Sequence, residues 1–203
     1  MPLRATTFLL LLTTLALPAA LQAGSLDRPA VPTKVGKGCL DEATVTTAND
    51  DGPGSLRALI AGLCDGGTIG FAERFVIDLQ SPITIDRALS LDGSDQALPA
   101  SEAGDNLVQL IGGADHRIFE VTATGDLTLR QLRLSNSHTG GLGGAINSLG
   151  RLAVLECRLD GNSTGTSGGL GGGAIFTGTD AILLVEGSTF DNNDAVRGAA
   201  IFN

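Results

Sequence analysis

The sequence predicts an all-β protein, a right-handed parallel β-helix with a short N-terminal capping helix. A glycine-rich box, Gly-Gly-Ala-Ile or a close variant, recurs at 143–146, 172–175 and 198–201, and its isoleucines are 29 and 26 residues apart. Short segments that alternate apolar and polar residues lie between the boxes. The chain has 29 glycines and neither tryptophan nor tyrosine. This composition suits a stack of small and branched side chains better than an aromatic core.

The length of the repeat narrows the choice of architecture. A period of 20–50 residues indicates a solenoid, a propeller or a helical array. Helical arrays need a 3.6-residue period that these segments lack, and propeller blades need about four longer strands. In a β-solenoid, inward residues such as Leu127, Leu129, Leu152 and Val154 would stack on the neighbouring coil about 4.8 Å away. Outward residues such as Thr128 would remain in solvent.

The glycines of the boxes are expected to form a sharp corner, because glycine tolerates positive φ. These predicted corner residues are Gly143, Gly144, Gly172, Gly173 and Gly198. A second motif, an apolar residue with asparagine three positions later, ends at Asn162 and Asn193, and a weaker copy ends one place early at Asn136. We expect Asn162 and Asn193 at a second corner, because asparagine accepts the left-handed conformation and its side chain can bond turn backbone. Stacked on successive coils, these asparagines are expected to bond one another in a ladder. Residues 162–164 also match a glycosylation acceptor, but the in-phase Asn193 favours the corner.

The N-terminal 23 residues are predicted to be a secretory signal peptide. Arg4 precedes an apolar run of ten residues at 8–17, and small residues follow up to Ala23. The alternatives are a membrane anchor or a buried helix, although the run is shorter than the roughly 20 residues that span a bilayer. No later segment is apolar enough to span, so the mature chain is predicted to have no transmembrane span. Residues 24–38 are Pro- and Gly-rich and are predicted to be an exposed leader.

Residues 39–67 are predicted to form a cap, and residues 68–203 the β-helix. Within the cap, residues 55–63 read as a short amphipathic helix that begins at Ser55 and covers the first coil. Cys39 and Cys64 flank this segment and are candidates for a disulfide in an oxidising compartment. The alternative is that the cysteines are buried thiols.

Two families resemble this sequence. The boxes, with Leu159-x-x-Asn162 and Phe190-x-x-Asn193, resemble the GG-A/I and F-x-x-N repeats of polymorphic outer-membrane proteins. Residues 49–60 (NDDGPGSLRALI) are similar to the CSLREA-type cap of exported bacterial right-handed β-helix proteins, with Gly54 in place of cysteine and Ala58 in place of glutamate. The resemblance covers residues 39–203. It implies a pectin-lyase-like fold that is secreted or held at the outer membrane or cell surface.

The end of the repeats raises an expectation of its own. Residues 201–203 fall inside an expected strand and no capping segment follows them. The β-helix is therefore predicted to be truncated at its C-terminus, either as a fragment or with an open last coil. An open apolar coil would be a site for self-association.

No catalytic, cofactor-binding or metal site is expected. The local acid clusters, at 191–194 with Arg197 and at 115–117, are better explained as solvated or stacked corners. Removing residues 1–23 removes one arginine and no acid, so the net charge changes from −9 to −10, which disfavours nucleic acid as a partner.

Two functions remain. The first is a non-enzymatic secreted or surface β-helix for adhesion or envelope display, with an unidentified surface component or carbohydrate as its ligand. The second is a polysaccharide lyase or glycosidase, or a remnant of one, because the fold alone does not decide activity.

Overall fold

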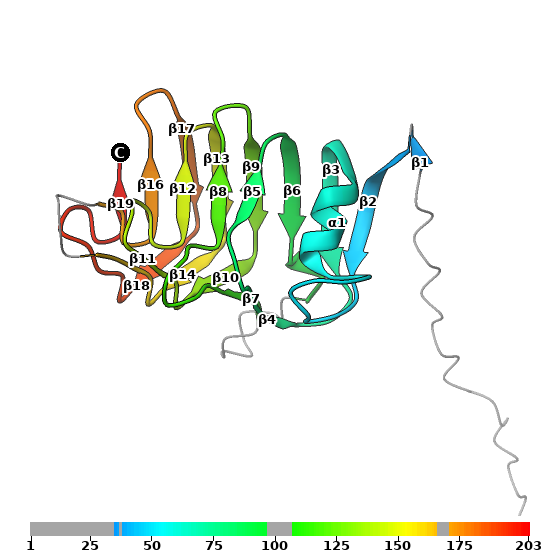
Figure 1. Cartoon of the computed structure of the whole chain (residues 1–203), viewed down its shortest axis with the longest axis horizontal. Coiled ribbons are helices and arrows are strands. Elements are labelled where there is room, and N and C mark those ends of the chain that lie inside the picture. Colours follow the sequence, from blue (N-terminus) through cyan, green and yellow to red (C-terminus); the bar gives the residue numbers. More distant parts are fainter. Residues whose placement is uncertain (1–34, 37, 97–106, 166–170) are drawn as a thin grey trace, which may run out of the picture. The chain divides into compact units, whose positions relative to one another are not determined.

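The computed structural model describes residues 35–36, 38–96, 107–165 and 171–203. These residues form a parallel β-helix of about five coils with one α-helix (Figure 1). The all-β parallel β-helix predicted from the sequence is therefore confirmed. The predicted signal peptide and most of the predicted leader lie outside the described residues.

Each coil crosses three sheets, here called A, B and C, in that order along the chain (Figure 1). Sheet A contains β1 (Val35–Gly36), β2 (Cys39–Val45), β3 (Leu63–Phe71), β6 (Ala88–Asp92), β9 (Asp126–Arg130), β13 (Arg151–Leu155) and β17 (Ile182–Glu186). Sheet B contains β4 (Val76–Asp78), β7 (Val108–Ile111), β10 (Leu132–Ser135), β14 (Arg158–Asp160) and β18 (Thr189–Asp191). Sheet C contains β5 (Ile83–Ile85), β8 (Phe119–Val121), β12 (Ile146–Ser148), β16 (Ile175–Thr177) and β19 (Ile201–Phe202). A small fourth sheet pairs β11 (His138–Thr139) with β15 (Ser163–Thr164), and a 3-10 turn covers Ser94–Gln96.

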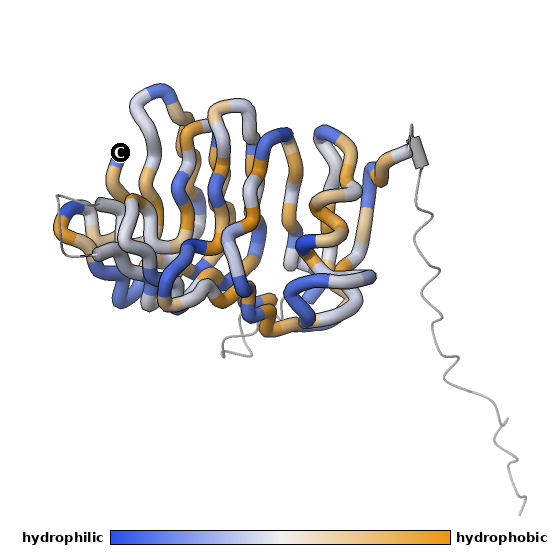
Figure 2. Tube along the Cα trace, viewed as in Figure 1, coloured by the Kyte–Doolittle hydropathy of each residue, from blue (hydrophilic) through white to orange (hydrophobic). Residues whose placement is uncertain are grey.

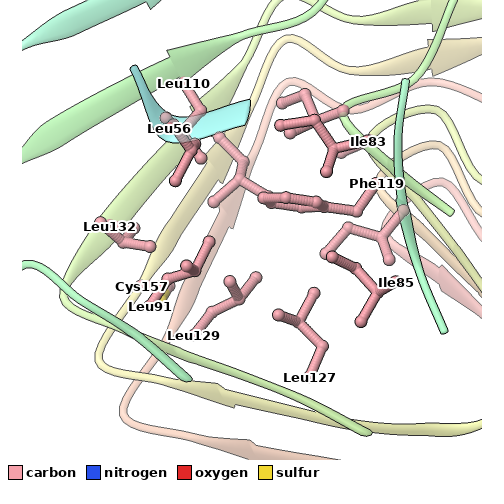
Figure 3. Close-up of a cluster of buried hydrophobic side chains, with 14 of the residues drawn as sticks. Leu56, Ile83, Ile85, Leu91, Leu110, Phe119, Leu127, Leu129, Leu132 and Cys157 are labelled. Carbon is pink, nitrogen blue, oxygen red and sulfur yellow. The ribbon is translucent and has the colours of Figure 1, made fainter. Parts of the chain in front are cut away.

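The core is a set of ladders of like residues from successive coils. In sheet A, the inward positions of β6, β9, β13 and β17 pair in register and hold Leu89, Leu127, Leu152 and Leu183. In Figure 3, side chains from all three sheets point into one interior, with Phe119 of sheet C among leucines of sheets A and B. Hydropathy alternates along the strands, as Figure 2 shows. Because an inward residue is followed by an outward one, each strand buries one side and solvates the other.

In the last three coils, three corners per coil carry left-handed backbone. The first glycine of each box is one of them, since φ is 70° at Gly143, 75° at Gly172 and 55° at Gly198. The second corner lies between sheets B and C, and its left-handed residue has φ of 54° at Asn136, 64° at Gly161 and 51° at Asn192. The third corner, between sheets A and B, is held by Gln131, Glu156 and Gly187.

Two expected corner roles differ from the structure. Asn162 and Asn193 were expected to adopt the left-handed conformation, but the residue before each of them does so. Gly144 and Gly173 do not have positive φ either. Glycine is required at these two positions because there is no room for a side chain. A Cβ on Gly144 would overlap the carbonyl oxygen of Gly173 on the next coil, and a Cβ on Gly173 would overlap the carbonyl oxygen of Ala199.

Helix α1 (Leu56–Gly62) lies at the N-terminal end of the coils, beside β2 and β3 (Figure 1). Ser55 is its N-cap, and the Ser55 hydroxyl accepts a hydrogen bond from the backbone N–H of Ala58. Leu56 is fully buried. Arg57 donates to the carbonyl oxygens of Ser81 and Pro82, at 2.7 and 3.2 Å, just before β5. The helix is thus held against the first complete coil.

Strands β1 and β2 precede the helix in the chain, and β3 follows it directly. Cys39 and Cys64 form a disulfide with a Cα–Cα distance of 5.1 Å, joining β2 to β3. β1 pairs antiparallel with β2, Val35 opposite Leu40. Val35 and Gly36 of the predicted leader are therefore part of sheet A, and the predicted boundary between cap and β-helix at residue 68 falls inside β3.

The third box supplies a matched control for the close approach of coils. Replacing Gly173 with alanine should lower the free energy of unfolding by about 2–3 kcal/mol, because backbone atoms of Asp194 lie 2.8 Å from the new Cβ. Replacing Ala199, which occupies the same position of the last box, with glycine should change it by less than about 1 kcal/mol. Urea unfolding followed by circular dichroism measures both. Equal effects would show that the glycine is not required for coil contact.

Candidate functional site

The outer face of sheet B carries a ladder of ion pairs between coils. Arg133 donates to both carboxylate oxygens of Asp160 on the next coil, at 2.7 and 2.6 Å. Arg158 lies 3.7 Å from Asp160 and 3.5 Å from Asp191, one coil further. Each arginine thus reaches an acid two positions on in the following coil. Asp160 is only 8% exposed, so this acid mainly serves to hold coils together.

The outer face of sheet A carries a second set of pairs and a shallow hollow. Arg151 lies 3.2 Å from Asp126, and Arg130 lies 3.4 Å from Glu156. The hollow, about 260 Å³ in volume, is lined by Asp126, Thr128, Arg151, Leu152, Ala153, Ile182 and Leu184. The hollow forms because Ala153 has a small side chain at an outward position where the neighbouring coils carry larger ones.

The outer face of sheet C is the most aromatic one. Phe176 and Phe202 stack with ring centroids 6.0 Å apart, in register on β16 and β19. On an earlier coil, Arg117 lies 3.9 Å from Glu120. Burial lowers the pKa of the Arg117 guanidinium, an effect that Glu120 opposes. Arg117 nevertheless remains charged at neutral pH, because an arginine titrates far above it.

The predicted asparagine ladder lies inside the corner between sheets B and C. The Asn162 backbone and side-chain N–H groups both donate to Oδ1 of Asn193, at 3.0 Å. Asn162 Nδ2 also donates to the carbonyl of Leu134, and Asn193 Nδ2 donates to that of Leu159. One coil earlier, the Ser137 backbone and hydroxyl donate to Oδ1 of Asn162, at 3.2 and 2.7 Å. The weaker repeat therefore continues the ladder with Ser137, while Asn136 forms the corner itself.

The burial of Asn162 bears on the glycosylation pattern at 162–164. Its side chain is fully buried and is hydrogen-bonded to Leu134, Asn193 and Ser137. An oligosaccharide cannot be attached to this amide while the coil is folded. The corner role explains this asparagine.

The two acid clusters noted in the sequence do not converge on a reactive geometry. Asp191 pairs with Arg158, Asn192 forms a corner and Asn193 belongs to the ladder. Asp194 contributes its backbone, which pairs with residues of the preceding coil. In the other cluster, Nε2 of His116 bonds the carbonyl of Leu79 at 2.9 Å. In each cluster, the residues named here have structural roles in their own corner of the coil.

Cys157 is the remaining cysteine among the described residues, and it faces the core. It is 3% exposed, and burial raises the pKa of its thiol to about 11. Because the thiolate is the reactive form, this thiol is inert at neutral pH. Among the residues that the structure describes, no three His, Cys, Asp or Glu side chains gather where they could hold a metal ion.

Sequence reasoning missed two features of these faces. One is the Arg-to-Asp stagger of sheet B, which depends on the register between coils. The other is the apolar outer surface of β17, signalled by the uninterrupted apolar run Ile182–Val185.

In the described part of the chain, no helix is long and apolar enough to cross a membrane. Comparison with known proteins found no matching family model, no matching curated protein and no matching solved structure.

The ladder makes a quantitative prediction. Replacing Asn162 with alanine should lower the free energy of unfolding by about 3 kcal/mol, because it leaves Ser137, Leu134 and Asn193 with buried groups that have lost their partner. Asn147, outward on sheet C, is the control, and its replacement with alanine should cost less than about 1 kcal/mol. Urea unfolding measures both. An equal loss at the two sites would contradict the ladder.

Proposed function

We propose that this chain is a non-enzymatic, exported β-helix, secreted or held at the cell surface, which displays its outer faces for adhesion or envelope contact. The resemblance of its boxes to polymorphic outer-membrane protein repeats, and of residues 49–60 to the CSLREA-type cap, supports this placement. On this proposal the fold is of the pectin-lyase-like kind, used as a scaffold.

The observation that carries the proposal is the coil-to-coil pairing of the outward acids. Catalysis by a glycosidase needs two carboxyl groups at a defined separation, one on each side of the scissile bond. Here the outward acids Asp160 and Asp191 lie against Arg133 and Arg158, at 2.6 and 3.5 Å. Their arginines stabilise coil contacts, and this is a structural role.

The net charge indicates which ligand to expect. A mature chain of net charge −10 repels anionic polymers. A neutral polysaccharide is therefore the carbohydrate class that fits this surface, with bonds to its hydroxyls supplied by outward polar side chains.

The test compares binding with turnover, on protein recovered from the medium or envelope of expressing cells. We expect retention on an immobilised neutral polysaccharide such as xylan, with no new reducing ends, and no unsaturated uronate products from polygalacturonate. Asp191→Ala should leave retention within about twofold of the unaltered protein, because the Asp191 carboxylate pairs with Arg158 of the preceding coil and not with the ligand. The matched control is Asp180→Ala, which removes an exposed carboxylate from a turn.

Turnover that Asp191→Ala abolishes and Asp180→Ala preserves would contradict the proposal. It would instead establish the chain as a lyase or glycosidase. Absence of retention on every polysaccharide, with none turned over, would remove carbohydrate as the ligand class.

A further inference from the structure

From β9 to β17 the outer face of sheet A becomes more apolar. One outward row, paired in register, holds Ala88, Asp126, Arg151 and Ile182. The next row holds Ser90, Thr128, Ala153 and Leu184. Ile182 and Leu184 are each 52% exposed, although they are large and apolar. A strand that is apolar on both sides, as β17 is, is typical of strands covered on both faces.

Each of these two rows is complementary to a second copy of itself that runs in the opposite order. Reversal of the first row places Ile182 over Ala88 and Arg151 over Asp126. Reversal of the second row places Leu184 over Ser90 and Thr128 over Ala153. Large side chains therefore meet small ones, and the acid meets the base, at every position of both rows.

A two-fold axis produces this reversal. If the axis runs close to the strand direction between β9 and β13, it lays β9 on β13 of a second copy and β17 on β6. Such an interface is isologous, since the same surface is used by both copies. Face-to-face sheets pack about 10 Å apart, with their strands within about 30° of each other.

We propose that the outer face of sheet A binds a second copy of this chain, forming a two-fold face-to-face dimer. At the axis, Asp126 and Arg151 of each copy form a network of two acids and two bases. They are partly exposed in the single chain, at 43% and 63% of their side-chain surfaces, and lie 3.2 Å apart. The hollow over Ala153 receives Thr128 of the second copy, and Ile182 and Leu184 cover the small residues of β6.

The other apolar surfaces lack this complementarity. The exposed Leu149, at 48%, lies in the turn between β12 and β13, next to Gly178. The inward residues of β17 face the preceding coils rather than a partner surface. Two of the three outward rows of sheet A combine matched charges with matched sizes. In the third row, which holds Asp92, Arg130, Leu155 and Glu186 at the edge of this face, the same reversal places Asp92 over Glu186.

The experiment uses charge reversal, with molar mass measured by sedimentation at 150 mM salt and about 50 µM protein, above a micromolar Kd. The unaltered protein should be a dimer. Asp126→Arg places four cations at the axis, and Arg151→Asp places four acids there, so each variant alone should dimerise at least about 100-fold more weakly. A 1:1 mixture of the two should restore the dimer, because one copy then supplies the cations and the other the acids.

Two further variants separate the interface from folding. Leu184→Glu should give a monomer, whereas Leu149→Glu, an equally exposed leucine elsewhere, should leave the dimer intact. Circular dichroism establishes that each variant is folded. A monomeric unaltered protein, single charge variants that dimerise as it does, or a mixture of folded variants that stays monomeric would each overturn the proposal.

Discussion

The whole structure depends on one constraint, that each coil must lie in register on the coil before it at a strand spacing of about 4.8 Å. A single coil of short strands cannot bury its inward residues by itself, so stability comes from contacts between neighbours. The repeats meet this constraint with identical or similar residues at matched positions, as with Leu127 and Leu152. Gly144 and Gly173 allow this close stacking because they have no side chain, and the backbone of the next coil occupies the space that a side chain would need.

The same register determines the chemistry of the outer faces. Charged residues that are distant in sequence become neighbours across coils, as Arg133 and Asp160 do, and their charges are then engaged in holding coils together. A chain with 22 acids and 13 lysines and arginines therefore presents structural pairs where its repeats stack. What remains for recognition is the shape and polarity of whole faces, and sheet A differs from the other two in carrying matched rows of charged and apolar residues.

Much of the fold was predictable because its signals are local. The inward positions of Leu127 and Leu152 were expected from alternation alone, and Ser55 from its capping chemistry. The ladder of Asn162 and Asn193 was expected from their phase, but the substitution of Ser137 in the earlier coil was not, since serine and asparagine share only the ability to bond a neighbouring amide. Residues Val35–Gly36 were assigned to the leader because a two-residue strand has no period to detect.

The outer faces were less predictable, for a physical reason. Which arginine meets which acid depends on register across coils of unequal length, and loops between strands vary in size. Sequence therefore identified Asp191 as part of an acidic cluster, while its partner Arg158, on the preceding coil, is evident only in three dimensions. The outward exposure of Ile182 and Leu184 likewise depends on which side of β17 faces the core.

Native-state hydrogen exchange measured by NMR tests the stacking of coils most directly. The amides of β9, β10 and β13, which lie between coils on both sides, should exchange most slowly and at rates close to those of global unfolding. Amides of β1 and β17, at the edges of sheet A, should exchange much faster. Rapid exchange throughout β9 to β13, or slow exchange confined to α1 and the disulfide-linked strands, would contradict the account.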